Sequence, residues 1–399
     1  MVLEADQIAS QSSGKNGGNF QLLPESYVGI YEGIIGERIK WLNKQRPLLS
    51  KGEIRRLAEA HARVLYNFSY QNMIRFIALV EKEKLDIDFS SAGWVKASSD
   101  AQEEKMMNID SNWIKSLDRK NIIELWPAKK IEETLNIPAK HVGRYVANNG
   151  NYHPYKFVSE ILKRSISKGV QLYTKVRVNS VHPSMHNDVE LVTSEGKLRA
   201  KKVIVATNAF TPLLFPELSA IKVHVSQIMN LEHVRNHLKG MTVTEQYGDI
   251  YYQFPKSKTY QDKNETYGLL HYGLDQDGPK ADIYAIGVQE NHFKKMKAQI
   301  DARFPETQGQ PPSRMWVGPM AFTEDRAPLI GFFHPKNTPS NHDNNIIVAA
   351  GFQGYGGSFC FHAGYVASEM ALSGKVHADV PEDVFSPERH YPGSTYGLK

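Results

Sequence analysis

Two glycine-rich segments of this 399-residue chain could bind an anionic ligand through their backbone. The first is SSGKNGG at residues 12–18, and the second is AAGFQGYGGS at residues 349–358, between an apolar stretch and a helix-like one. Free amide groups and the positive end of a helix dipole at such loops stabilise negative charge. The apolar stretch at the N-terminus ends in Glu4, and an acid at the end of a strand binds the ribose in dinucleotide-binding folds.

Each feature also has an ordinary interpretation. One glycine loop between a strand and a helix is equally consistent with a tight turn, and Gly356-Gly357 could be a plain helix entry. A third strand-like stretch, VIVATNAF at residues 203–210, is followed by a similar loop. The order of these features along one chain is therefore more informative than any one of them.

Composition limits the classes of protein that the chain can represent. Its 41% apolar and 23% charged residues are typical of a soluble globular protein, and its length predicts two or three domains. The net charge of +5 comes from scattered Lys and Arg residues, which gives little support to a nucleic-acid partner. No apolar run reaches the roughly 18 residues of a membrane helix, and the N-terminus has no signal-peptide pattern. The single cysteine, Cys360, fits a reducing compartment, so we expect a cytoplasmic protein.

Metal chemistry has little support in the sequence. Two histidine pairs, His182 with His186 and His233 with His237, have the four-residue spacing of helix-borne ligands. Neither pair has an evident third ligand. We therefore predict no metal site.

Both helices and strands are expected along the chain. Residues 50–85 read as one long helix or two stacked ones, with Ser50 and Glu53 as a capping box. Further helices are expected from Pro154 to Gly169, at residues 291–303, and after the second glycine segment as far as Gly374. Strand-like runs occupy residues 92–98, 170–181, 189–200, 201–209, 221–231, 250–254, 267–274 and 344–351. The fold class is therefore mixed α/β, with the last 25 residues as a tail packed on the surface.

The order of these motifs resembles the FAD-dependent oxidoreductases of the D-amino acid oxidase, glycine oxidase and sarcosine oxidase family. The resemblance covers residues 1 to about 375, and its most specific part is the pair of motifs W-x-G…T-x-D-x-x-P-x-x-G and a-G-F-x-G-h-G. The matching residues are Trp316, Gly318, Thr323, Asp325, Pro328 and Gly331 for the first, and Ala350, Gly351, Phe352, Gln353, Gly354, Tyr355 and Gly356 for the second. Ser13-Gly14-Lys15-Asn16-Gly17-Gly18, His153-Pro154 and Val203 to Ala209 match three further motifs, with Asn208 where glycine is usual.

The resemblance implies a set of contacts with non-covalently bound FAD. Glu4 would bind the ribose, and Val178 would contact the adenine through its backbone. Amide groups of Tyr355, Gly356, Gly357 and Ser358 would stabilise the negative charge of the reduced flavin. The full set of cofactor-binding residues is Glu4, Ser13, Lys15, Asn16, Gly17, Gly18, Val178, Ala206, Thr207, Gly351, Gly354, Tyr355, Gly356, Gly357 and Ser358. Cys360, one turn into the helix, is expected to be a small buried residue rather than a flavin ligand.

One family feature is absent from the sequence. Family members begin with a strand and a G-x-G-x-x-G turn that binds the FAD pyrophosphate, and no such turn precedes Glu4. We expect that the chain starts about 30 residues late, by the size of a βαβ unit, either through a misassigned start or as a natural short form. The FAD-binding domain is thus expected to be Rossmann-like and N-terminally truncated, with little activity in the chain as written.

The implied reaction is oxidation of a C–N bond of an amine or amino acid by hydride transfer to FAD, with oxygen or another acceptor reoxidising the flavin. Positions that would carry a carboxylate-binding Lys or Arg fall at Ser358 and near Met320, while Arg326 is expected to point away from the flavin. This pattern favours an amine or a substituted amino acid. Pocket candidates are Tyr251, Tyr252, His271, Tyr272 and Tyr355, although only one of each adjacent pair can point inward. His153 and Trp316 are expected to be structural.

The predicted domains are interleaved. Residues 1–90, 150–215 and 312–375 form the FAD-binding domain, residues 91–149 and 216–311 form a substrate domain on a mostly antiparallel sheet, and residues 376–399 are the C-terminal tail. The alternative to an enzyme is a non-catalytic homologue that acts as an assembly or regulatory protein without FAD. Colour separates the two, because only the enzyme would be a yellow flavoprotein.

Overall fold

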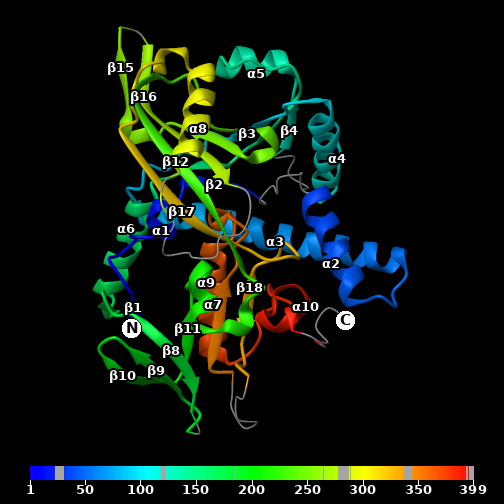
Figure 1. Cartoon of the computed structure of the whole chain (residues 1–399), viewed down its shortest axis with the longest axis vertical. Coiled ribbons are helices and arrows are strands. Elements are labelled where there is room, and N and C mark those ends of the chain that lie inside the picture. The colour runs from blue at the N-terminus through cyan, green and yellow to red at the C-terminus, as the bar shows by residue number, and fades with distance from the viewer. Residues whose placement is uncertain are drawn as a thin grey trace.

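A large antiparallel sheet and a group of smaller sheets occupy opposite ends of the molecule (Figure 1). This computed structural model describes residues 1–22, 31–117, 123–184, 186–263, 265–276, 287, 289–336, 344–391 and 394. The long helix α3 (Lys51–Glu83) runs between the two ends of the molecule. Among these residues, no helix has both the length and the apolar character needed to cross a bilayer.

The large sheet has nine strands and confirms the expected mostly antiparallel architecture. Its order is β17-β12-β16-β14-β13-β3-β5-β4, with β15 paired to β16, and only β3 and β13 run parallel. The bounds are β3 (Trp94–Ala97), β4 (Ile123–Trp126), β5 (Gly143–Val146), β12 (Lys222–Arg235), β13 (Thr242–Glu245), β14 (Ile250–Gln253), β15 (Thr259–Asp262), β16 (Glu265–Gln276) and β17 (Arg314–Phe322). The domain division remains a prediction, and β17, which it gives to the FAD-binding part, pairs with β12 in this sheet.

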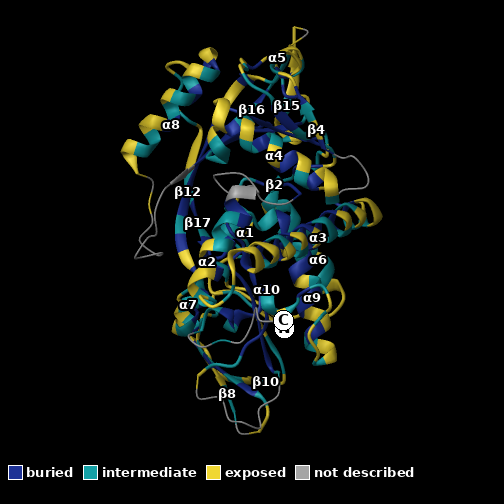
Figure 2. Cartoon of the chain, turned by 90° about the vertical axis from the view of Figure 1, so that its right-hand side faces the viewer, coloured by how far each residue is buried: buried dark blue, intermediate teal, exposed yellow. Residues whose placement is uncertain are grey.

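The two faces of this sheet differ in polarity. One face is apolar and packs against α8 (Glu290–Arg303), with Met296 and Ile300 in its core. The other face carries polar side chains and lies against the short helix α1 (Ser12–Lys15), which contacts β17. Figure 2 shows β12 and β17 between α8 and α1. We call these the core face and the site face.

The smaller sheets contain the parallel strands at the other end of the molecule. β1 (Val2–Leu3) pairs in parallel with β7 (Leu172–Tyr173), and β11 (Val203–Val205) pairs in parallel with β19 (Ile346–Ala350). β18 (Leu329–Phe332) is antiparallel to β19. The remaining strands are β2 (Asn19–Phe20) with β6 (Gly150–Asn151), and the meander of β8 (Val178–Pro183), β9 (Val189–Thr193) and β10 (Gly196–Ala200).

The main expected helices are confirmed, with their caps. Ser50 and Glu53 form both halves of the capping box of α3, which is one continuous helix. The helix α6 (Pro154–Ser167) begins after His153, whose side chain accepts a hydrogen bond from the Lys156 amide. The other helices are α2 (Glu37–Gln45), α4 (Ala101–Leu117), α5 (Ala128–Leu135), α7 (Thr211–Leu214), α9 (Cys360–Ser373) and α10 (Glu382–Phe385). Short turns of 3-10 or π helix lie at Tyr31–Gly36, Asn208–Phe210, Pro216–Leu218, Gln246–Gly248, Lys256–Lys258, Pro305–Thr307, Gly356–Ser358 and Pro387–His390.

Part of the C-terminal segment lies in the core, so the expectation of a tail on the surface is wrong for Val380, residues 384–387 and Arg389. Val384 and Phe385 are fully buried. The Arg389 guanidinium donates to both carboxylate oxygens of Asp325, at 2.7 and 2.9 Å. Burial by itself would raise the pKa of Asp325, but Arg389, His390 and Arg38 outweigh burial and hold the pKa well below its usual range. The tail therefore anchors the loop that carries the T-x-D motif.

Candidate functional site

The first glycine segment is attached to the site face of the large sheet at three points. The Trp316 indole Nε1 donates to the Lys15 carbonyl at 2.7 Å, and the Ser12 hydroxyl donates to the Pro319 carbonyl at 2.8 Å. The Gln253 carboxamide donates to the Gly17 carbonyl. Because β12 and β16 lie between β17 and β14, the segment crosses the face of these two strands.

Asn16 folds the loop onto itself. Its Nδ2 donates to the carbonyls of Ser12 and Ser13 at 2.8 and 3.1 Å, and its Oδ1 accepts from the Gly18 amide at 2.8 Å. Gly18 has a positive φ of 69°, which glycine adopts without strain. The side chain of Asn16 therefore shapes the loop, and flavin contacts of Ser13, Lys15 and Asn16 remain predictions.

Tyr251 links this loop to the sheet. A Cβ atom added at Gly17 would overlap the Tyr251 ring and hydroxyl, and one added at Gly273 would overlap the same ring from the other side. The ring thus fills the space that two missing side chains leave, one in the loop and one in β16. Tyr251 is 8% exposed, so it is held between loop and sheet at the site.

The neighbouring residue Tyr252 faces away from the site, and its prediction as a pocket residue is wrong. Tyr252 and Tyr272 stack with ring centroids 6.0 Å apart on the core face, and the Phe304 ring lies 5.5 Å from that of Tyr252. Burial raises the pKa of the Tyr252 hydroxyl well above its usual value. The same alternation along β16 puts Tyr272 in the core and His271 on the site face.

His271 is a buried, neutral imidazole under the glycine loop. Its Nδ1 lies 2.9 Å from Asn230 Oδ1, an acceptor, so Nδ1 carries the proton and Nε2 has a lone pair. The Nε2 atom is buried and has no hydrogen-bond partner among the described residues. Burial, with a smaller contribution from His153, lowers the pKa of His271 to about 4. The Tyr251 and Trp316 rings lie 6.0 and 5.5 Å from it.

An open space lies in front of Gly318, between the two glycine segments. Trp316 contacts the first glycine segment at Lys15. Met320 contacts the second glycine segment, because its sulfur lies 3.1 Å from a Cβ atom placed on Gly354. Gly318 lies between them on the same face of β17 and is buried. A Cβ atom on Gly318 would nevertheless meet no atom of the described residues within 4 Å. Gly318 is therefore buried, with open space where a side chain would lie.

The second glycine segment approaches the first closely. A Cβ atom on Gly357 would overlap the carbonyl oxygen of Asn19, which follows the first segment. Asn208, where the family usually has glycine, accepts from the amides of Gly351 and Phe352 at 3.0 and 3.4 Å. The side chain of Asn208 therefore fixes the start of this segment, a role that its position 143 residues earlier gave no reason to expect.

Two of the four amides expected at the flavin are already used. The Tyr355 amide donates to the Phe352 carbonyl, and the Ser358 amide donates to the Tyr355 carbonyl, both at 2.9 Å. The amides of Tyr355 and Ser358 are therefore not free to donate to the flavin, contrary to the expectation. No acceptor for the amides of Gly356 and Gly357 occurs among the described residues.

Cys360 is not the buried residue expected from the sequence. Its side chain is exposed, and its sulfur lies 3.1 Å from a Cβ atom placed on Gly356. Surrounding protein still desolvates the thiol enough to raise its pKa to about 12. The thiol lies beside the second glycine segment.

Glu4 and Val178, assigned to the adenosine, lie at one end of the smaller sheets. The Glu4 amide donates to the Tyr173 carbonyl, and the Glu4 carbonyl accepts from the Val176 amide, both at 2.9 Å. Val176 lies two residues before Val178. At the carboxyl end of β11, Ala206 and Thr207 are exposed. Ligands of α/β sheets bind at such uncovered carboxyl ends. The residues present thus fit the adenosine and flavin ends of FAD, and no G-x-G-x-x-G turn for the pyrophosphate occurs among them.

The two positions at which a carboxylate-binding cation would fall lie at the second glycine segment. Ser358 is buried and its hydroxyl donates to the Gln21 carbonyl at 2.7 Å, and Met320 faces Gly354. The Arg326 guanidinium lies over the Phe322 ring, 5.5 Å from the centroid, and its direction relative to the flavin stays a prediction. Since Phe322 shares the site face with Gly318, Arg326 lies at the edge of this face.

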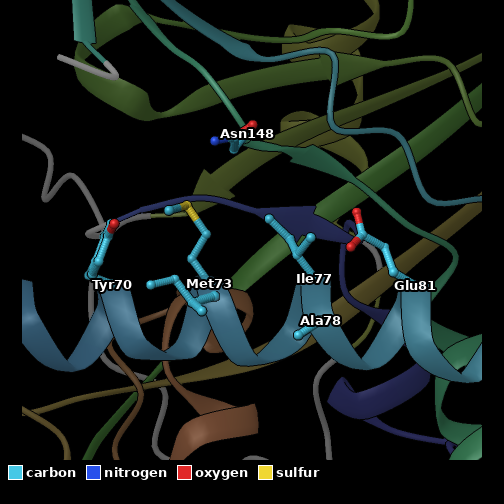
Figure 3. A pocket seen from close by; sticks show the side chains of 7 residues that line it. Tyr70, Met73, Ile77, Ala78, Glu81 and Asn148 are labelled. Atoms are coloured by element: carbon cyan, nitrogen blue, oxygen red, sulfur yellow. The ribbon is translucent and has the colours of Figure 1, made fainter. Parts of the chain in front are cut away.

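Two other features lie apart from this site. A shallow hollow of about 300 Å³ on α3 is lined by seven residues, including Met73, Ile77 and Asn148 (Figure 3). None of the predicted cofactor or pocket residues lines it. Among the described residues, no three His, Cys, Asp or Glu side chains are grouped so that they could bind a metal ion.

A family model, related sequences and solved structures all match this chain. The model of the DAO family, described as FAD dependent oxidoreductase, matches residues 1–370. Gamma-glutamylputrescine oxidoreductase of Escherichia coli (strain K12) is 23% identical over 402 residues, covering 98% of this chain and 81% of the relative. Monomeric sarcosine oxidase of Bacillus sp. (strain B-0618) is 23% identical over 313 residues, covering 75% and 72%. The crystal structure of glycine oxidase from Geobacillus kaustophilus has a similar fold, with a TM-score of 0.70, 16% identity and coverage of 98% and 92%.

Proposed function

Because the chain belongs to the DAO family of FAD-dependent oxidoreductases, we propose that it oxidises the C–N bond of an amine or a substituted amino acid. The chemistry that FAD supplies when bound is acceptance of a hydride from the carbon next to nitrogen. The resulting imine is hydrolysed in water, and oxygen or another acceptor takes up the electrons. The single cysteine in the chain supports a reducing compartment, the cytoplasm.

The observation that carries this proposal is the space at Gly318 between the two glycine segments. Both segments are rich in glycine, which suits the close approach of a flat aromatic ring. The amides of Gly356 and Gly357 would donate toward the ring edge on which negative charge develops. Cofactor-binding roles of Glu4, Val178 and the other predicted residues are part of the same proposal.

The substrate side of this space is aromatic and neutral. The Tyr251 and Trp316 rings lie beside His271 on the site face, and aromatic rings attract a cationic amine. His271 stays neutral at pH 7 because burial disfavours its charged form, so it does not repel an ammonium group. With Met320 and Ser358 in place of carboxylate-binding cations, an amine or a substituted amino acid fits better than a simple amino acid. Tyr355, in the second segment, is the other aromatic candidate.

The test is flavin binding followed by reduction without oxygen. Purified protein is titrated with FAD, and a panel of primary amines, secondary amines and amino acids is then added anaerobically. We expect a yellow complex whose visible flavin absorbance is bleached by amines. A preparation that stays colourless with added FAD would overturn the proposal and favour a non-catalytic protein.

A matched pair of glycine variants locates the reaction. Gly318→Leu places a side chain into the proposed space, so we expect bleaching to be lost. Gly364→Leu is the control, because Gly364 on α9 is exposed and also has no atom within 4 Å of its Cβ position. Equal bleaching by both variants would show that the space at Gly318 is not the reaction site.

A further inference from the structure

A chain of buried hydrogen bonds runs through the site face and ends on the first glycine segment. Asn151 Nδ2 donates to the Thr242 hydroxyl at 3.1 Å, and that hydroxyl donates to Gln253 Oε1 at 2.8 Å. Gln253 Nε2 then donates to the Gly17 carbonyl. The three side chains are at most 2% exposed, so water does not compete for these bonds.

The order of donors in this chain fixes which way the Gln253 carboxamide points. The Thr242 hydroxyl accepts a hydrogen bond from the Asn151 amide, and it has one proton of its own. It donates this proton to Gln253 Oε1. A rotated carboxamide would place its oxygen against the Gly17 carbonyl, and two acceptors would face each other. Gln253 therefore presents its amide to the loop in one orientation only.

The contact is a hydrogen bond between the loop and β14, beside the packing of the Tyr251 ring on Gly17. Trp316 and Ser12 attach the segment to β17, at the edge of the sheet. Gln253 attaches its far end, next to Gly18 and the start of β2. Without this bond, residues 16–18 would be held by Asn16 within the loop, by packing on Tyr251, and by the Tyr152 amide, which donates to the Gly18 carbonyl at 2.9 Å.

We propose that Gln253 is a positioning residue that sets the place of the Lys15–Gly18 loop against the flavin. The proposal rests on the function proposed above, and it adds that the substrate-side sheet determines the shape of a cofactor-binding loop. Asn151 and Thr242 act through Gln253 by fixing its orientation. Gln253 does not itself touch the reacting atoms.

The test compares Gln253→Leu with Gln227→Leu. Gln227 is also a buried glutamine of the large sheet, but it lies on the core face, and its oxygen accepts from the Gln289 amide at 2.8 Å. Each variant loses a buried carboxamide of the same size. We expect Gln253→Leu to weaken FAD binding about tenfold, the effect of one buried hydrogen bond, and to shift the flavin absorption band. Gln227→Leu should change FAD affinity less than about twofold at a similar loss of thermal stability.

A second measurement needs no flavin and separates this proposal from the proposed function. Hydrogen exchange of the amides of residues 15–18 in FAD-free protein should be faster in Gln253→Leu than in wild type or Gln227→Leu. Unchanged exchange, or equal loss of FAD affinity in both variants, would overturn the positioning role. If wild-type protein binds no FAD while exchange still changes as expected, the proposed function fails and the attachment of the loop by Gln253 stands.

Discussion

The two faces of the large sheet use adjacent residues for opposite purposes. On β14 and β16, Tyr252 and Tyr272 enter an apolar core, while Tyr251 and His271 lie one residue earlier on the site face. The core face is filled by close-packed side chains. The site face instead carries glycines, aromatic rings and amides that contact a loop and border an open space. A one-residue offset therefore separates stability from binding on the same strands.

The largest expected effect is on the core face. Tyr252→Ala removes a fully buried ring and should lower the free energy of unfolding by about 3–5 kcal/mol. Chemical denaturation followed by circular dichroism measures this change. The comparison variant is Tyr251→Phe, which removes only a hydroxyl on the site face and should cost about 1 kcal/mol or less. Equal costs for the two would contradict the assignment of faces.

The next effect is a dependence on pH that comes from His271. Its pKa of about 4 in the folded chain is lower than the usual 6.5, so between these values the unfolded chain binds the extra proton. The unfolding free energy therefore falls as pH falls from 6.5 to 4, by at most about 3 kcal/mol from this residue. His271→Asn, which can still donate to Asn230, should lose that part of the pH dependence. Parallel curves for the variant and wild type from pH 7 to 4.5 would contradict a neutral, buried His271.

A smaller effect separates two glycines on the site face. Gly273→Ala places a methyl group where the Tyr251 ring lies, and such overpacking costs about 1–3 kcal/mol. Gly318→Ala places the same group in open space and should change stability by less than about 0.5 kcal/mol. Thermal unfolding of both variants tests the pair. A larger loss in Gly318→Ala would show that the space in front of Gly318 is filled.

The sequence predicts elements better than it predicts contacts. The capping box at Ser50, Pro154 at the start of α6, and Gly374 after α9 are local signals, and all three agree with the structure. The alternation rule correctly restricted each tyrosine or histidine pair to one inward residue. It did not say which one, because the direction of a strand's faces depends on what packs against them.

Long-range contacts of the site had no signal that a single sequence could give. Gln253 meets Gly17 across 236 positions, and Asn208 meets Gly351 across 143. Both are common polar residues in ordinary strand-end contexts. The prediction of a surface tail failed at the C-terminal segment for a related reason. In the sequence, Arg389 has the character of a surface charge, and only the fold places Asp325 beside it.

Hydrogen exchange with and without FAD is the most direct test of the site as a whole. Binding should slow exchange of amides in both glycine segments, at residues 12–18 and 351–358, and around Gly318. Exchange of the amides of core-face residues on β14 and β16 should change no more than exchange in the rest of the sheet. Protection of only one segment, or of neither, would show that the two segments do not enclose a common cofactor.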